Sequence, residues 1–179
     1  MIPLCEYPRP QMRRSADSWR CLNGPWRYAI EKGDLPQGED VQMPSTQGSI
    51  VVPYAPESEL SGVMRQLQPN EVLWYERSLE KGDIPPLPEG GRLLLHFGAV
   101  DQSCRVYVNG RLVGSHEGGY HAFALDITAL MQPRDNRLLV AVTDPSNMGY
   151  RAWGKQSLKP GGIWYHATSG IWQTVWLEA

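Results

Sequence analysis

Short runs of alternating apolar and polar residues recur along the chain, and turn residues separate them. Trp26–Ile30 is one such run and ends at Lys32-Gly33-Asp34, while Val72–Leu79 is rich in β-forming residues and ends at Lys81-Gly82-Asp83. A period of two residues is expected of a strand with one buried face. Segments with the 3.6-residue period of an amphipathic helix are missing. The pattern therefore predicts an all-β chain.

The middle of the chain carries the clearest strand signals. Arg92–Phe97 is apolar enough to predict a strand that is covered on both faces. Asn109-Gly110 separates two β-type runs and is a strong hairpin signal, because a type I′ turn needs positive φ at both central residues. The other predicted strands are Ser49–Val52, Arg105–Val108, Arg111–Gly114, Ala122–Ile127, Asn136–Asp144 and Ile171–Leu177.

About eight short strands joined by loops predict an antiparallel β-sandwich. Uneven loops, including the long one from Pro145 to Gly162, favour a jelly roll over a regular up-and-down barrel. Thr128–Leu130 is expected to form a single helical turn that Asp126 caps. The length of 179 residues and the lack of an internal repeat indicate one domain over residues 1–179.

The composition is that of a soluble globular protein, with 41% hydrophobic and 20% charged residues. A net charge of −2 gives no electrostatic footprint for nucleic acid or for an acidic membrane surface. No stretch approaches the ~20 apolar residues of a membrane span. The N-terminal segment lacks the basic start and apolar run of a signal peptide. We therefore expect a cytoplasmic protein without nucleic-acid or membrane partners.

Cysteine and histidine usage argues against a metal site. Cys5, Cys21 and Cys104 form no short metal-type spacing. Reduced and mostly buried thiols are expected, in keeping with a cytosolic compartment. His116 and His121 are close in sequence, but a metal site would need further ligands, and we interpret them as hydrogen-bonded loop histidines. No metal and no cofactor is expected.

The aromatic residues are mostly Trp and Tyr, and many of them lie in the last part of the chain. The chain has 7 Trp and 8 Tyr but only 2 Phe, and the segment from Gly161 to Ala179 is dense in Trp and Tyr. Both residue types join an apolar ring to a polar group, which favours wet interfaces over dry cores. Such residues suit a surface that stacks on the flat apolar faces of sugar rings. The alternative is that they are core or rim residues of the β-fold.

Candidate catalytic groups are hard to combine into a site. The sequence has no Gly-x-Ser-x-Gly motif and no Gly-rich phosphate loop followed by a helix. Glycoside hydrolysis needs two carboxyl groups roughly 5–10 Å apart in different environments. Nothing in the sequence couples any two of the carboxylates considered, which are Glu57, Glu59, Glu117, Asp126 and Asp144. Glu57 and Glu59 are expected to be solvated acids in a turn, and no catalytic residue is assigned.

Two loops fit a binding surface better. In Glu117–His121, glycines let the backbone approach a neighbour, and Tyr120 can stack on a ligand. The loop from Asp144 to Trp164 combines aromatic rings with polar groups that bond to hydroxyls, as carbohydrate recognition requires. The candidate substrate-binding residues are Tyr120, Asp144, Arg151, Trp153, Lys155, Gln156 and Trp164. Packing of the second loop on another domain is an equally open interpretation.

An ordered series of motifs covers nearly the whole chain. It begins with Arg9-Pro10 and Leu22–Trp26 and ends with Ser169–Glu178. The motifs between them are Val52–Ser58, Trp74–Arg77, Leu95–Asp101, Val106–Gly110, Gly118–Tyr120 and Gly154–Gln156. Together they resemble the N-terminal sugar-binding domain of glycoside hydrolase family 2, which includes β-galactosidases, β-glucuronidases and β-mannosidases.

The resemblance implies a galactose-binding-like jelly roll that precedes an immunoglobulin-like sandwich and a catalytic TIM barrel in the same polypeptide. It also implies that both catalytic glutamates lie in the barrel, so the chain alone is expected not to hydrolyse glycosides. In this family the N-terminal domain supports the barrel and lends loops to the rim of the active site. The implied partners are a β-glycoside and the two later domains.

Two positions depart from the family pattern. Typical β-galactosidases and β-glucuronidases have a sugar-contacting aspartate six residues before the Gly of the Gly-Ile pair, and Trp164 stands there in this sequence. An aromatic ring cannot replace the bonds of a carboxylate to hydroxyls, although it can stack on the sugar. The asparagine that some galactosidases carry after the Val-Pro pair is replaced by Tyr54-Ala55. The specificity of a galactosidase is therefore not implied.

Three functions stay open on the sequence alone. The first is an accessory domain of a family 2 glycosidase, and the second is an independent carbohydrate-binding module. The third is a structural domain whose aromatic residues only pack against the barrel. The chain ends at Ala179, close behind the last predicted strand, where we expect a domain border. A continuing reading frame there would favour the first function, and a native stop would favour the second.

Overall fold

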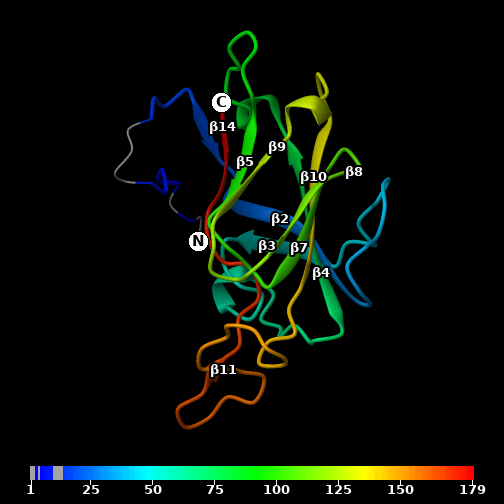
Figure 1. Cartoon of the computed structure of the whole chain (residues 1–179), viewed down its shortest axis with the longest axis vertical. Coiled ribbons are helices and arrows are strands. Elements are labelled where there is room, and N and C mark those ends of the chain that lie inside the picture. The colour runs from blue at the N-terminus through cyan, green and yellow to red at the C-terminus, as the bar shows by residue number, and fades with distance from the viewer. Residues whose placement is uncertain (1–2, 4, 10–13) are drawn as a thin grey trace.

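Two antiparallel sheets pack face to face in the structure, a computed structural model that describes residues 3, 5–9 and 14–179 (Figure 1). The six-stranded sheet has the order β3 (Gly48–Val52), β2 (Gly24–Lys32), β4 (Glu71–Leu79), β10 (Asn136–Thr143), β7 (Ser103–Val108) and β8 (Arg111–Glu117). The four-stranded sheet has the order β1 (Trp19–Cys21), β14 (Val175–Glu178), β5 (Leu94–Phe97) and β9 (Phe123–Asp126). The chain crosses repeatedly from one sheet to the other, as in a jelly roll. The predicted antiparallel β-sandwich is confirmed.

Four shorter strands and three turns of 3-10 helix complete the described elements. β6 (Val100–Asp101) pairs with β13 (Gly170–Ile171), and β11 (Gln156–Ser157) pairs with β12 (Tyr165–His166). The helical turns are η1 (Glu59–Ser61), η2 (Lys81–Asp83) and η3 (Thr128–Leu130), of which the sequence predicts the last. No helix within the described residues is long and apolar enough to cross a membrane.

Two local turn predictions are confirmed. Asn109 and Gly110 connect β7 to β8 with φ angles of 53° and 82°, the left-handed backbone that a type I′ turn requires. Oδ1 of Asn109 also accepts a hydrogen bond of 2.8 Å from the backbone N–H of Arg137, which ties the turn to β10. At the start of η3, Oδ1 of Asp126 accepts a hydrogen bond of 3.0 Å from the backbone N–H of Thr128.

The predicted continuous strand over Ile171–Leu177 is wrong. The segment is divided into β13, which pairs with β6, and β14, which pairs with β5 in the four-stranded sheet. Between these pairings, the backbone N–H of Ile171 donates to the Tyr75 hydroxyl and that of Val175 donates to Oδ1 of Asn23, both at 3.1 Å. These long-range bonds redirect the chain, whereas the sequence between Ile171 and Leu177 contains no glycine or proline that would mark the break.

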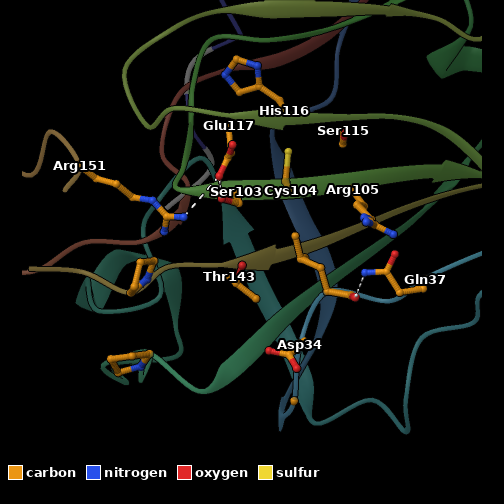
Figure 2. A pocket seen from close by; sticks show the side chains of 14 residues that line it. Asp34, Gln37, Ser103, Cys104, Arg105, Ser115, His116, Glu117, Thr143 and Arg151 are labelled. Atoms are coloured by element: carbon orange, nitrogen blue, oxygen red, sulfur yellow. Dashed lines mark hydrogen bonds and ion pairs between the residues drawn. The ribbon is translucent and has the colours of Figure 1, made fainter. Parts of the chain in front are cut away.

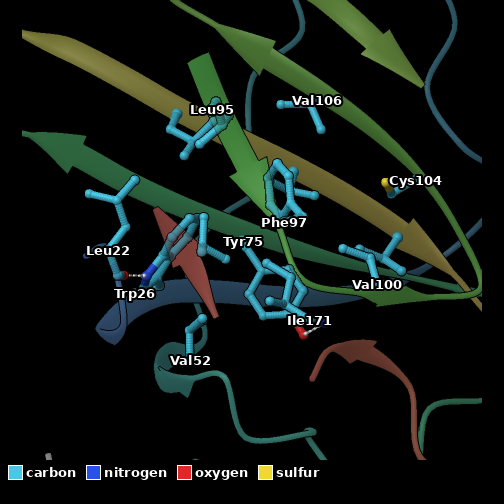
Figure 3. Close-up of a cluster of buried hydrophobic side chains, with 14 of the residues drawn as sticks. Leu22, Trp26, Val52, Tyr75, Leu95, Phe97, Val100, Cys104, Val106 and Ile171 are labelled. Atoms are coloured by element: carbon cyan, nitrogen blue, oxygen red, sulfur yellow. Dashed lines mark hydrogen bonds between the residues drawn. The ribbon is translucent and has the colours of Figure 1, made fainter. Parts of the chain in front are cut away.

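Side chains from both sheets meet in one core (Figure 3). Trp26 and Tyr75 from the six-stranded sheet and Phe97 from the four-stranded sheet are almost completely buried. Burial of a side chain of this size contributes at least about 1.5–3 kcal/mol. The polar edge of Trp26 is satisfied as well, because its Nε1 donates to the carbonyl of Leu22 at 2.8 Å. This core holds the sheets together and so fixes the loops at their ends relative to one another.

β5 is covered on both faces, as predicted. Leu95 and Phe97 belong to the core, whereas His96 stacks on Trp176 with ring centroids 4.8 Å apart. Arg9 of the N-terminal segment covers this second face. Its guanidinium lies 5.5 Å from the Trp176 ring centre, and its Nη2 lies 3.3 Å from Nδ1 of His96.

The expectation of reduced cysteines is wrong for two of the three. Cys5 and Cys21 form a disulfide with Cα atoms 5.6 Å apart, while Cys104 is free and buried. The N-terminal segment lies beside β1 because Tyr7 packs edge-on against Trp19, with ring centroids 5.2 Å apart. Spacing along the chain does not reveal this tertiary contact. Of the N-terminal residues considered for a signal peptide, 1, 2, 4 and 10 lie outside the described residues.

Candidate functional site

The loops that carry the candidate binding residues lie at one end of the sandwich (Figure 1). The loop of residues 145–169 leaves β10 and returns at β13, and the loop of residues 118–122 joins β8 to β9. The loop of residues 53–70, between β3 and β4, reaches the same place, since Glu57 bonds to Ser169. We call these three loops the loop end.

The loop end carries most of the exposed apolar side chains. Nine large ones are exposed within the described residues, and eight of these belong to the loop end: Leu60, Met64, Tyr120, Met148, Tyr150, Ile163, Trp164 and Tyr165. A concentration of exposed apolar side chains on one part of a protein marks an interaction surface. The loop end is therefore the best candidate for a binding surface.

Trp153 and Trp164 lie against each other in the long loop. Their ring centroids are 5.7 Å apart, and the ring planes differ by 30°. Gly161 and Trp164 exchange two backbone hydrogen bonds of 3.1 Å, which close a tight turn and fix the backbone that carries the Trp164 ring. Trp164 is nevertheless 42% exposed. The pair thus presents a preformed aromatic face to solvent.

Gln156 connects two loops of the loop end through its side-chain hydrogen bonds. Its Oε1 accepts hydrogen bonds from the backbone N–H (2.6 Å) and the hydroxyl (3.0 Å) of Thr168, and its Nε2 donates to the Tyr120 hydroxyl at 3.2 Å. Burial raises the pKa of Asp101, and a hydrogen bond from Gln156 partly offsets that rise. An amide has two donor and two acceptor positions, so those of Gln156 are used within the chain. Gln156 positions Tyr120 and holds the loop.

The Gly118-Gly119 turn packs tightly against its neighbours, as the sequence predicts. The backbone N–H groups of Gly118 and Gly119 donate to the carbonyl (2.9 Å) and to Oε1 (3.1 Å) of Gln102. Nε1 of Trp172 donates to the Gly119 carbonyl at 2.8 Å. A Cβ at Gly119 would overlap the carboxylate of Asp101. Only glycine fits here, and the turn is fixed on both sides.

The ion pair of Glu117 and Arg151, with 3.3 Å between Oε1 and Nη2, borders two hollows. One hollow, of about 490 Å³, lies on the six-stranded sheet, with Ser103 and Thr143 among its lining residues (Figure 2). The other, of about 310 Å³, lies at the loop end and includes Tyr120 in its wall. Two of the candidate binding residues, Tyr120 and Arg151, therefore share one pocket.

Asp144 lies beneath the loop end and only 5% of it is exposed. Its Oδ1 accepts a hydrogen bond of 2.6 Å from the backbone N–H of Ser146. Burial raises the pKa of Asp144 to about 7, and the nearby charge of Asp101 adds to this effect. The carboxyl is therefore partly protonated near neutral pH. It holds the backbone where the long loop begins.

The expectation that Glu57 is a solvated acid is wrong. Its carboxylate accepts hydrogen bonds from the backbone N–H groups of Leu67 and Ser169, both at 3.1 Å, and from the Ser169 hydroxyl at 2.6 Å. Burial raises the pKa of Glu57, although these hydrogen bonds lower it. Glu57 thereby fastens the 53–70 loop to the end of the 145–169 loop. Glu59 is exposed, as expected.

Lys155 and the histidines occupy separate places. Lys155 is exposed, its carbonyl accepts a hydrogen bond of 2.9 Å from the backbone N–H of Tyr165, and its ammonium has no ion-pair partner in the described part of the chain.

Nε2 of His116 lies 3.1 Å from the Gly118 carbonyl, and the His116 ring stacks on Phe123. Among the residues that the structure describes, no group of three or more His, Cys, Asp and Glu side chains is placed to hold a metal ion.

Sequence reasoning missed three residues that build the loop end, namely Asp101, Gln102 and Trp172. Asp101 belongs to β6 and lies opposite Gly170 of β13, far away in the sequence. No local pattern links these segments, because the contact exists only once the two short strands have paired. The order of the motifs gives the one hint, since Asp101 ends one of them.

Comparison with known proteins identifies a family and several relatives that are similar in sequence. Residues 60–178 match the family model described as glycosyl hydrolases family 2, sugar binding domain. A β-galactosidase of Thermoanaerobacter pseudethanolicus is 31% identical over 109 residues, which cover 60% of this chain and 14% of that protein. A β-glucuronidase of Paenibacillus borealis is 29% identical over 159 residues, which cover 88% of this chain and 24% of that protein. The chain thus spans a small part of the length of these relatives.

Solved structures share the fold. A β-glucuronidase of Faecalibacterium prausnitzii matches with a TM-score of 0.60 at 23% identity, over 93% of this chain and 32% of that one. A β-glucuronidase of Ruminococcus gnavus, in complex with a C6-substituted uronic isofagomine, matches with a TM-score of 0.62 at 22% identity, over 89% of this chain and 28% of that one. Likeness at these identities establishes the fold alone.

Proposed function

The chain belongs to the sugar-binding domain family of family 2 glycosyl hydrolases, and we propose that it is the non-catalytic N-terminal domain of a longer glycosidase. Its coverage of 14% and 24% of two relatives supports this. The acids at the loop end are engaged within the chain, because Glu57 and Asp144 hold backbone N–H groups and Glu117 pairs with Arg151. A glycosidase needs two carboxyl groups that face the scissile bond, and we assign them to another domain.

The loop end would form part of the rim of the active site in that glycosidase. The observation that carries this proposal is the concentration of exposed apolar side chains there, eight of the nine within the described residues. The Trp153–Trp164 pair faces solvent, and Glu57 and Gln156 hold the loops in place without help from another domain. A preformed aromatic surface beside a catalytic barrel would stack on the substrate and keep water out.

We propose a β-glycoside as the substrate and immunoglobulin-like and TIM-barrel domains of the same polypeptide as the partners. The names of the relatives, β-galactosidase and β-glucuronidase, support this substrate class. Trp164 takes the place where such enzymes carry a sugar-contacting aspartate, so stacking would replace a hydrogen bond at this position.

Kinetics of the full-length glycosidase test the role of the loop end. Trp164→Ala is expected to lower kcat/KM by at least about tenfold, or about 1.4 kcal/mol, because the stacking face is lost. The free energy of unfolding should change by less than about 0.5 kcal/mol, as for other exposed positions. Leu87→Ala is the matched control, since Leu87 is also 42% exposed but lies between η2 and β5. It should leave kcat/KM unchanged.

The opposite result would favour one of the other two functions. If Trp164→Ala kept the wild-type kinetics and unfolded more easily, Trp164 would be a packing residue and the domain would be structural. If the native chain ended at Ala179 and bound oligosaccharides by itself, it would be an independent carbohydrate-binding module.

A further inference from the structure

The smaller pocket at the loop end is formed entirely by this chain. Its volume of about 310 Å³ lies at the lower limit of ligand pockets, which range over ~300–1,000 Å³, and suits one small ring. It lies between the 118–122 loop and the start of the 145–169 loop, and Trp153 and Trp164 are not among its lining residues. The pocket is therefore distinct from the Trp pair at the tip of the loop.

Two tyrosines contribute aromatic walls to this pocket. Tyr120 is 48% exposed and is held by Gln156 at its hydroxyl and by Trp172 at its ring, with ring centroids 6.2 Å apart. Tyr150 is fully exposed and lines the same pocket from the long loop. Two exposed tyrosine rings at one pocket can stack on the apolar face of a pyranose.

The pocket also offers a hydrogen-bond acceptor and a donor side by side. The Glu117 carboxylate accepts and the Arg151 guanidinium donates. The Arg151 contact of 3.3 Å and a hydrogen bond of 3.4 Å from the Ser103 hydroxyl both end on Oε1 of Glu117, so Oε2 and the other guanidinium N–H groups are unused within the described residues. Neighbouring hydroxyls of a sugar need such a pairing of acceptor and donor. A carboxylated sugar is less suitable, because Glu117 repels it and already neutralises Arg151.

The floor of the pocket is rigid before any ligand arrives. Gln102 holds both backbone N–H groups of Gly118 and Gly119, and Trp172 holds the Gly119 carbonyl. Because the turn is already ordered, little conformational entropy is lost on binding.

We propose that this pocket binds a single neutral hexopyranose unit, which stacks on Tyr120 and Tyr150 and bonds through adjacent hydroxyls to Glu117 and Arg151. The site goes beyond the proposed contribution of the loop end to an active-site rim, because it needs no residue from another domain. It gives the 179-residue chain a sugar site of its own, separate from the Trp153–Trp164 face.

Nuclear magnetic resonance titration of the 179-residue chain tests this proposal, and the chain suits the test because it contains a complete two-sheet core. The probes are methyl β-D-galactopyranoside, methyl β-D-glucopyranoside and methyl β-D-glucuronide. At least one neutral glycoside is expected to give saturable shifts at residues 117–121 and 150–152, with a millimolar Kd. The glucuronide should bind more weakly than that glycoside.

Single substitutions separate the pocket from the rest of the surface. Tyr150→Ala and Glu117→Gln should each raise the Kd of the neutral glycoside about tenfold, equivalent to about 1.4 kcal/mol. Both side chains are exposed, so the fold should be kept. Leu87→Ala is the control, because Leu87 is 42% exposed, lies outside the loop end and does not line the pocket. It should leave the Kd unchanged.

Three results would each overturn the proposal. They are the absence of saturable shifts with both neutral glycosides, tighter binding of the glucuronide, and shifts that Tyr150→Ala and Glu117→Gln leave unaltered. None of them bears on the kinetic test of Trp164, so failure of this site and failure of the proposed function are distinguishable.

Discussion

At the scale of single residues, Asp144 shows how burial changes the chemistry of a loop. It lies where β10 passes into the 145–169 loop, is 5% exposed and has its pKa raised to about 7 by burial and by the charge of Asp101. In the unfolded chain the same carboxyl has the ordinary aspartate pKa of 3.8. Between these two values the folded chain binds more protons than the unfolded chain, so stability falls as pH rises.

Asp144→Asn is expected to remove this dependence. Asn keeps the acceptor for the Ser146 N–H but carries no charge, so the variant should gain about 2–4 kcal/mol over the wild type as pH rises from about 4 to above 7. Urea unfolding at several pH values measures the difference. Asp126→Asn is the control of opposite sign, since hydrogen bonds from Thr128 lower the pKa of Asp126 and its charge stabilises the fold above that pKa. A constant difference between Asp144→Asn and wild type across this pH range would contradict the assignment.

Structural roles that involve only neighbouring residues in the sequence could be predicted. Asp126 caps the turn that follows it, and Asn109-Gly110 forms its own hairpin turn. Glu57 could not be predicted, because its partner Ser169 is 112 residues away. The disulfide of Cys5 and Cys21 and the burial of Asp144 depend on tertiary packing in the same way.

At the scale of elements, the contact of β13 with β4 directs the chain from the loop end back into the sandwich. Gly170 has φ of +76°, and a Cβ at this position would overlap the hydroxyl of Tyr75. The same hydroxyl accepts the backbone N–H of Ile171 at 3.1 Å. A glycine is therefore required both by the backbone and by the space.

Gly170→Ala is expected to lower the free energy of unfolding by about 3 kcal/mol, the sum of a left-handed backbone penalty and overpacking. Gly154→Ala is the matched control, because Gly154 also has positive φ (+60°) but has no atom within 4 Å of its Cβ position. It should lose only about 1–2 kcal/mol. Urea unfolding of both variants measures the comparison, and equal losses would show that the contact with Tyr75 does not matter.

Most strands could be predicted from the sequence, because alternation and turn residues act locally. The split of the last strand could not, since Ile171–Leu177 contains no glycine, proline or other turn residue that would mark the break, while its two halves pair with different strands. The short strands β6, β11, β12 and β13 could not be predicted either. With two residues each, they are too short to show a period.

At the scale of the whole molecule, the strand count and the ordered motifs predicted the sandwich and the family. They also placed the candidate binding residues on two loops, which the fold brings to one end. What the sequence does not contain is the division of that end into a Trp153–Trp164 face and a separate pocket beside Tyr120. That division arises from hydrogen bonds of Gln156 and Gln102, whose partners lie in other segments.

The central claim is that the loop end forms part of an active-site rim in a longer glycosidase. Amide hydrogen exchange of that full-length enzyme, with and without a competitive inhibitor bound in its active site, tests it most directly. The inhibitor is expected to slow exchange in residues 145–169, while residues 80–93, which join β4 to β5, exchange at the same rate as before. Unchanged exchange throughout residues 145–169 with the inhibitor bound would contradict the claim.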